Sequence, residues 1–241
     1  MRLFAIGDLH LSGHPPKKPM EIFGPRWKDH WSRIQEDWNS RVTADDTVLI
    51  AGDTSWAMHL KDAQEDLDEI RALPGRKLII RGNHDFWWES AGKLNRMDAE
   101  HNMQYLYGTT VTLDEGRIAV CGTHGWVCPG DIHYKEERDA KPYRRELLRV
   151  ERTLQEAEKL GCKHTILLLH YPPVCDLTKP SGFTELLEKY KVPLCIFGHL
   201  HGMQPNTMFP RRYNGTLLHL VSADYRDCKL LEITFDEEDA L

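Results

Sequence analysis

The stretch KLIIRGNHDFWW, residues 77–88, changes character midway. It begins with the apolar run 78–80, which is typical of a buried β-strand. After an arginine and a glycine, Asn83, His84 and Asp85 place an amide, an imidazole and a carboxylate in direct succession. A turn could end one strand in this way. Other apolar runs of the chain end similarly, however, and we therefore interpret the pattern as part of a functional site.

The other apolar runs with polar ends are RLFAIGDLH, TVLIAGD, TILLLH and LCIFGHLH. Their length is typical of strands buried on both faces of a sheet. Apolar residues at helical spacing lie between the runs and predict helices over residues 27–42, 60–70, about 142–160 and 183–190. Strands that alternate with helices indicate a largely parallel sheet.

Two segments depart from this alternation. Residues 109–122 predict a β-hairpin that turns at 114–116, and residues 216–235 look like a second antiparallel pair. We therefore expect an α/β fold with mixed sheets, two of them facing each other and helices outside. The length fits a single domain over residues 1–241, although two small domains are compatible with it.

The composition excludes several classes of protein. The chain is 41% hydrophobic and 28% charged, as expected for a soluble globular protein. Its net charge of −6 provides no overall positive field for nucleic acid or anionic lipid. The N-terminal apolar run is too short for a signal-peptide core, and no run approaches the ~18 residues of a membrane span. The six cysteines form no CxxC pair. We expect a cytoplasmic protein with reduced thiols.

The polar residues at the strand ends predict a metal site. In open α/β sheets, ligands bind beyond the carboxyl ends of the strands. Imidazole, carboxylate and amide groups suit Mn²⁺, iron or Zn²⁺. The candidate ligands are too many for one tetrahedral ion: Asp8, His10, Asp53, Asn83, His170, His199 and His201. If Asp53 bridges two ions, each ion receives four protein ligands.

Two such ions favour chemistry at phosphorus. Two divalent cations, two carboxylates and one hydroxide would leave about one positive charge for a phosphate. Paired ions roughly 3.5–4 Å apart can stabilise both the attacking and the leaving oxygen of an in-line displacement, and they supply hydroxide near neutral pH. The sequence therefore predicts a metal-dependent phosphoesterase.

The order of these motifs resembles the calcineurin-like metallophosphoesterase superfamily. The motifs are Asp-Leu-His at 8–10, Gly-Asp at 52–53, Gly-Asn-His-Asp at 82–85, the histidine at 170 and Gly-His-Leu-His at 198–201. The resemblance implies a four-layer α/β/β/α sandwich. It also implies that one metal is held by Asp8, His10, Asp53 and His201, and the other by Asp53, Asn83, His170 and His199.

The same resemblance implies a catalytic role for His84, which would stabilise the phosphoryl oxygens or protonate the leaving group. Asp85 would brace either the loop or the imidazole. Trp56 marks a departure, because protein phosphatases of this superfamily have there an aspartate that orients the catalytic histidine. We also expect Trp87 and Trp88 either to pack beneath the site or to wall the pocket, and His124 to be a loop histidine in water rather than a pocket residue.

The expected substrates are phosphorylated small molecules or nucleotide-like phosphomonoesters and phosphodiesters, with no nucleic-acid or membrane partner. Three alternatives remain: a nuclease of the same superfamily, a Ser/Thr protein phosphatase, and a non-catalytic scaffold with the same fold. The negative net charge argues against the nuclease, Trp56 against the protein phosphatase, and the full set of candidate ligands against the scaffold.

Overall fold

Two β-sheets form the centre of the molecule in a computed structural model, which describes residues 1–175, 179–205 and 207–235. The first sheet has the order β11-β1-β2-β3-β4 and the second β5-β6-β7-β8-β10-β9. The strands of the first are β1 (Leu3–Ile6), β2 (Thr47–Ile50), β3 (Arg76–Ile80), β4 (Met103–Leu106) and β11 (Leu231–Ile233). Those of the second are β5 (Thr109–Leu113), β6 (Ile118–Gly122), β7 (His164–Leu168), β8 (Leu194–Phe197), β9 (Arg211–Tyr213) and β10 (Thr216–Leu220).

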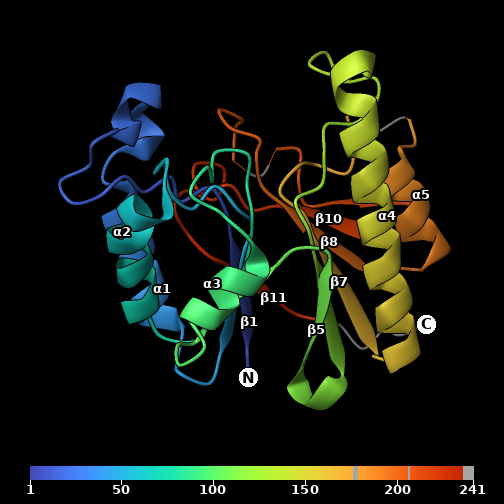
Figure 1. The fold of residues 1–241 in the computed structure, drawn as a ribbon, viewed down its shortest axis with the longest axis horizontal. Helices are drawn as coiled ribbons and strands as arrows, with labels where there is room; N and C mark the ends of the chain where they lie inside the picture. The colour runs from blue at the N-terminus through green and yellow to red at the C-terminus, as the bar shows by residue number, and fades with distance from the viewer. Residues whose placement is uncertain (176–178, 206, 236–241) are drawn as a thin grey trace.

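The helices cover the outer faces of the two sheets. On one side lie α1 (His30–Arg41), α2 (Leu60–Ala72) and α3 (Ala91–Met97), and on the other α4 (Glu136–Leu160) and α5 (Gly182–Lys189) (Figure 1). Short 3₁₀ turns occur at Met20–Phe23, Pro25–Trp27 and Asp114–Gly116. The predicted four-layer α/β/β/α sandwich of two mixed sheets is therefore confirmed.

Three apolar clusters hold the layers together. Leu49, Leu78 and Ile166 belong to the cluster formed by side chains of both sheets, and all three are fully buried. Residues such as Ile34 belong to a second cluster, shared by the first sheet and α1 and α2, and Phe183 to a third beneath α4 and α5. Strands buried on both faces explain why these runs are apolar at every position rather than at alternate ones.

The sequence predictions need two corrections in the regular elements. Residues 216–235 do not form an antiparallel pair: β10 pairs with β8 and β9, whereas β11 crosses to the first sheet and pairs with β1. The first helix begins only at His30, because Trp27 lies in a separate 3₁₀ turn. The apolar pattern of residues 216–235 is the expected one, but contacts with strands distant in the sequence decide which strands β10 and β11 pair with.

The strands that carry the candidate site run parallel. β1, β2 and β3 pair parallel in one sheet, as do β7 and β8 in the other. Within each sheet their carboxyl ends therefore lie at the same edge. A parallel bridge between Gly7 and Ser222 joins the segment after β1 to the segment after β10. This bridge brings loops of both sheets together at these edges.

Candidate metal centre

The backbone turns sharply where the strands deliver their polar side chains. Asp8, His10, Asp53 and His199 all have positive φ, at 58°, 48°, 50° and 72°. This left-handed region is unfavourable for residues other than glycine and persists only where the surroundings enforce it. Such strain at four residues in three segments is typical of a functional site.

One group of candidate ligands lies around Asp8. The Nε2 atoms of His10 and His201 are 3.4 Å apart, and His201 Nε2 is also 3.4 Å from Asp8 Oδ1. The donor atoms of these three residues lie close enough together to hold one metal ion. Burial alone would raise the pKa of Asp8, but the neighbouring His201 holds it below its usual value.

A second group lies around Asn83. Its Oδ1 atom is 2.7 Å from His170 Nε2 and 2.8 Å from His199 Nδ1. The other nitrogen of His170, Nδ1, is 2.9 Å from the carbonyl oxygen of Ala51. That contact fixes the ring so that Nε2 points to the interior of the site.

Asp53 lies between the two groups. Its Oδ2 atom is 3.7 Å from His10 Nε2 and 3.6 Å from His170 Nε2, and it is buried without a hydrogen-bond partner. Burial, with Asp8 and Asp85 nearby, raises the pKa of Asp53 to about 7. A buried oxygen that lacks a partner and faces donor atoms on both sides fits a bridging metal ligand.

Glycines in the motifs allow the ligand segments to pack closely. A Cβ atom at Gly82 would lie 2.1 Å from the backbone nitrogen of Asp53, and one at Gly198 would lie 2.4 Å from Asp8 Oδ2. No side chain fits at either distance. The glycines before Asn83 and His199 are therefore required by the close approach of the strand ends.

His84 lies beside the two ligand groups rather than within them. Its ring centroid is 5.7 Å from that of His10 and 4.3 Å from that of Trp56. Its backbone N–H donates to Asp53 Oδ1 at 2.7 Å. Burial, together with His170 and Lys18, lowers the pKa of His84, which favours the neutral ring.

Asp85 braces the loop, which was one of its two expected roles. Its Oδ1 accepts hydrogen bonds from the backbone N–H groups of Thr54 and Ser55 and from Trp87 Nε1, and its Oδ2 accepts one from Gly82 N. Within the described part of the chain no carboxylate bonds to the ring of His84. The aromatic ring of Trp56 lies against that imidazole instead.

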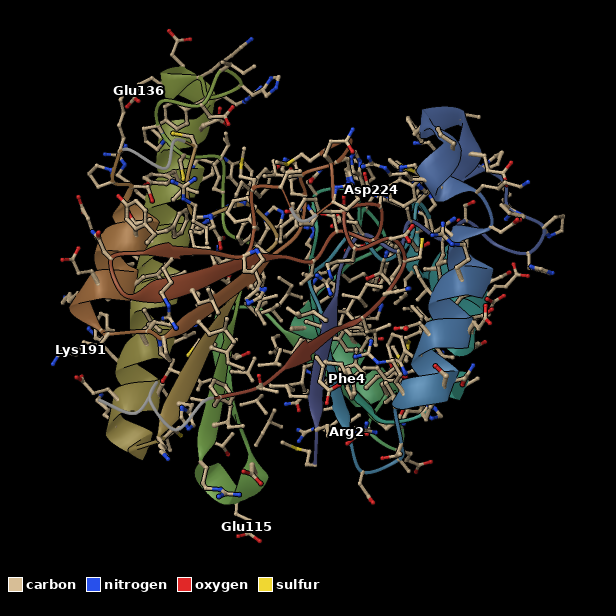
Figure 2. The ribbon with its side chains drawn as sticks, turned by 180° about the vertical axis from the view of Figure 1, so that it is seen from behind. Arg2, Phe4, Glu115, Glu136, Lys191 and Asp224 are labelled. Carbon is tan, nitrogen blue, oxygen red and sulfur yellow. The ribbon has the colours of Figure 1, made fainter. Side chains whose placement is uncertain are left out.

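The structure adds Asp224, which the sequence analysis missed. Its Oδ1 is 2.9 Å from His201 Nδ1, and its Oδ2 accepts from the N–H of Gly202 at 2.8 Å. Burial would lower the pKa of His201, but Asp8 and Asp224 raise it to about 10. Asp224 lies at the end of the molecule opposite Arg2 and Glu115 (Figure 2). The signal was present, since LLHLVSAD is one more apolar run that ends in a carboxylate.

Three aromatic residues take positions that the sequence left open or misplaced. Trp87 and Trp88 are buried in the apolar cluster shared by the first sheet, α1 and α2, so they pack in the core. The expectation for His124 was wrong, because it is buried and its ring lies parallel to that of His170 at 5.9 Å. Burial lowers the pKa of His124 well below its ordinary value, so it packs as a neutral ring.

Comparison with known proteins identifies the class of the molecule. The sequence profile of the calcineurin-like phosphoesterase family matches residues 1–203. The chain therefore belongs to this family, as the motif order predicted. The family and the Asp/His clusters together support a metal-dependent phosphoesterase.

Individual relatives are distant or match in part. The Gene 66 protein of Mycobacterium phage L5 is 41% identical over 80 residues, which is 32% of this chain and 37% of that protein. The chain thus matches only about a third of that relative's length.

Solved structures share the fold at low identity. A protein of unknown function from Aquifex aeolicus, AQ665, has a TM-score of 0.52 at 17% identity, with 96% of this chain and 95% of that chain covered. The sulfate thiohydrolase SoxB of Thermus thermophilus has a TM-score of 0.51 at 15% identity, with 93% and 52% covered. TT1561 of Thermus thermophilus has a TM-score of 0.55 at 12% identity, with 96% and 97% covered.

Among the described residues, none of the helices combines the length and the hydropathy that a membrane span requires. The cysteines at positions 121, 128, 162, 175, 195 and 228 are all free thiols.

Proposed function

We propose that the protein is a dinuclear metal-dependent phosphohydrolase that cleaves phosphomonoesters or phosphodiesters of small, nucleotide-like molecules in the cytoplasm. The position of Asp53 carries this proposal, because its partnerless Oδ2 faces His10 on one side and His170 on the other. The free thiols are consistent with a reducing compartment.

The donor set fits two ions of the Mn²⁺, iron or Zn²⁺ type. One ion would be held by Asp8, His10, Asp53 and His201, and the other by Asp53, Asn83, His170 and His199. When bound, such a pair activates water and neutralises charge on the phosphate. The cations would also relieve the repulsion between Asp8 and Asp53, which helps to raise the pKa of Asp53 in their absence.

His84 would act on the substrate directly. It is half-buried and lies next to His10 without belonging to either ligand group. Its neutral ring can donate a hydrogen bond to a phosphoryl oxygen, and once protonated it can transfer a proton to the leaving oxygen. The backbone bond from its N–H to Asp53 fixes the loop relative to the bridging ligand.

The reactions of two chromogenic esters test this proposal. We expect the protein, loaded in turn with Mn²⁺, Fe²⁺ and Zn²⁺, to hydrolyse 4-nitrophenyl phosphate or bis(4-nitrophenyl) phosphate. His84→Ala should retain both metals by elemental analysis but lose about 10²–10⁴ in rate. Asp53→Asn should lose metal. Absence of turnover at full metal occupancy would contradict the proposed function.

A further inference from the structure

Lys18 places a positive charge beside the candidate centre. Its Nζ atom lies 2.9 Å from the centre of the Trp56 ring and 5.6 Å from that of Phe23. Among the described residues no carboxylate lies within 4.0 Å of this ammonium group. Desolvation lowers the pKa of Lys18, so its charge is not compensated by the surroundings.

The Trp56 ring connects Lys18 to the site. It stacks on His10 with ring centroids 4.7 Å apart and an angle of 19° between the planes, and it is 4.3 Å from His84. The lysine ammonium is therefore separated from a candidate metal ligand and from the proposed acid by one aromatic ring. His84 also responds to the charge of Lys18, which contributes to its lowered pKa.

Hydrogen bonds fix both residues to the segment that follows β1. The hydroxyl of Ser12 accepts from the N–H of Lys18 at 3.0 Å and donates to the carbonyl oxygen of Lys18 at 3.1 Å. The N–H of Trp56 donates to the carbonyl oxygen of Leu11 at 2.8 Å. Leu11 directly follows His10, so the position of the lysine is set by the chain that carries the candidate ligands.

Lys18 and Trp56 open onto a cavity of about 490 Å³. Lys17, Met58 and Phe86 also line it, with two carboxylates, Asp62 and Asp66. The carboxylate of Asp66 is already engaged, because it accepts hydrogen bonds from Gly13 N and from the Ser55 hydroxyl. The rings of Trp56 and Phe86 lie next to His84, at 4.3 Å and 6.4 Å between centroids, so the aromatic wall and Lys18 lie at the side of the cavity nearest His84.

We propose that Lys18 and Trp56 form a subsite for a second phosphate of the substrate, on the leaving-group side of the centre. This inference rests on the proposed function, because His84 marks that side. Lysine binds phosphate as a compact point charge. The preferred substrates are therefore phosphoric anhydrides and esters whose leaving group is itself a phosphate.

Hydrolysis of a diphosphate consumes one water molecule and gives two phosphates. Water adds its oxygen to one phosphorus, the bond from that phosphorus to the bridging oxygen breaks, and its electron pair remains on the departing phosphate. The attacking water gives up one proton as the new bond forms. His84, once protonated, would supply a proton to the departing oxygen and would be reprotonated by the one that the water gives up, and Lys18 would offset the charge that develops on that oxygen.

Kinetics with two substrates test the subsite. With the Mn²⁺-loaded protein we compare inorganic pyrophosphate with 4-nitrophenyl phosphate, whose leaving group carries no second phosphate. Lys18→Met should raise KM for pyrophosphate about tenfold relative to KM for 4-nitrophenyl phosphate, as expected for the loss of one charge-assisted contact. A change that acts through the pKa of His84 would alter kcat for both substrates alike and leave this ratio of KM values unchanged. Lys18→Arg should restore part of the difference. Lys28→Met removes the same charge from an exposed lysine and should affect neither substrate.

A binding measurement separates failure of the subsite from failure of the proposed function. By calorimetry, methylenediphosphonate should bind the wild type about tenfold more tightly than it binds Lys18→Met, and methylphosphonate should not distinguish them. Absence of all turnover would contradict the proposed function, whereas the calorimetry would still decide on the subsite. Turnover of 4-nitrophenyl phosphate with equal effects of Lys18→Met on both substrates, or with none, would overturn the subsite alone.

Discussion

A single buried carboxylate sets the ring of one candidate ligand. Asp224 holds His201 through Nδ1 and leaves Nε2 facing Asp8, an arrangement that orients metal-binding histidines in general. We expect Asp224→Ala to weaken metal binding about 10–100-fold by calorimetry with Mn²⁺. Asp227→Ala removes an exposed carboxylate paired with Arg33 and should leave the affinity unchanged. Equal affinity in wild type and Asp224→Ala would show that Asp224 does not position His201.

Another prediction at the scale of the residue concerns Gly82. A methyl group there would lie 2.1 Å from the backbone nitrogen of Asp53, so one of the two segments must move. We expect Gly82→Ala to lower the free energy of unfolding by about 1–3 kcal/mol and to reduce the bound metal. Gly92→Ala in α3 meets only the end of Arg96, at 3.6 Å, and should be neutral or stabilising. Urea unfolding and elemental analysis of both variants would show whether the close approach matters.

At the scale of the element, Asp46 joins the start of β1 to the turn before β2. Its carboxylate accepts bonds from Arg2 N, Arg2 Nη2, Thr43 N and Thr43 Oγ1. Burial alone would raise the pKa of Asp46, but these bonds from Thr43 and Arg2 hold it below its ordinary value. The stabilisation is therefore present above about pH 4 and is lost as the pH falls through the folded pKa.

We expect Asp46→Asn to lower the free energy of unfolding by about 1–3 kcal/mol at pH 7. Because the unfolded wild type takes up a proton on Asp46 below its ordinary pKa while the folded state keeps the carboxylate ionised, the difference should shrink as the pH falls from about 4 to 2. Asp45→Asn, at the exposed neighbouring position, should show neither effect. A difference between Asp46→Asn and wild type that stays constant with pH would assign the effect to packing instead of charge.

Elements differ in how far the sequence could predict them. The run Leu78–Ile80 of β3 is apolar and fully buried, and ligand-type residues follow it directly, so both the strand and its functional end could be predicted. β11 was also recognised as a strand, but its partner was wrong, since pairing with β1 rather than β10 depends on a crossing between sheets. The short helix α3 and the strand β4 lay in regions where no motif was recognised.

At the scale of the whole molecule, the sequence predicted the candidate site only in part. The order of motifs predicted which residues gather, because parallel strands end at the same edge. It could not predict that Trp56 contacts His10, His84 and Lys18 together, since these contacts form between side chains of the loops beyond the strands, where strand pairing does not fix how side chains meet. The burial of His124 was also missed, although β6, the strand before it, pairs parallel with β7, the strand before His170.

At the scale of the whole molecule, we expect one substitution to change the melting temperature in opposite directions with and without metal. Asp53 and Asp8 are buried side by side, and their repulsion opposes folding when no cation is present. Mn²⁺ at about 100 times its dissociation constant should stabilise the wild type by about 2.7 kcal/mol, a rise in Tm of several degrees. Asp53→Asn removes one of the repelling charges and the bridging ligand at once. In EDTA it should therefore melt at or above the wild-type temperature, and in Mn²⁺ below it. Scanning calorimetry under both conditions measures this crossing, and Asp53→Asn melting below the wild type in both would mean that the carboxylate stabilises the fold by itself.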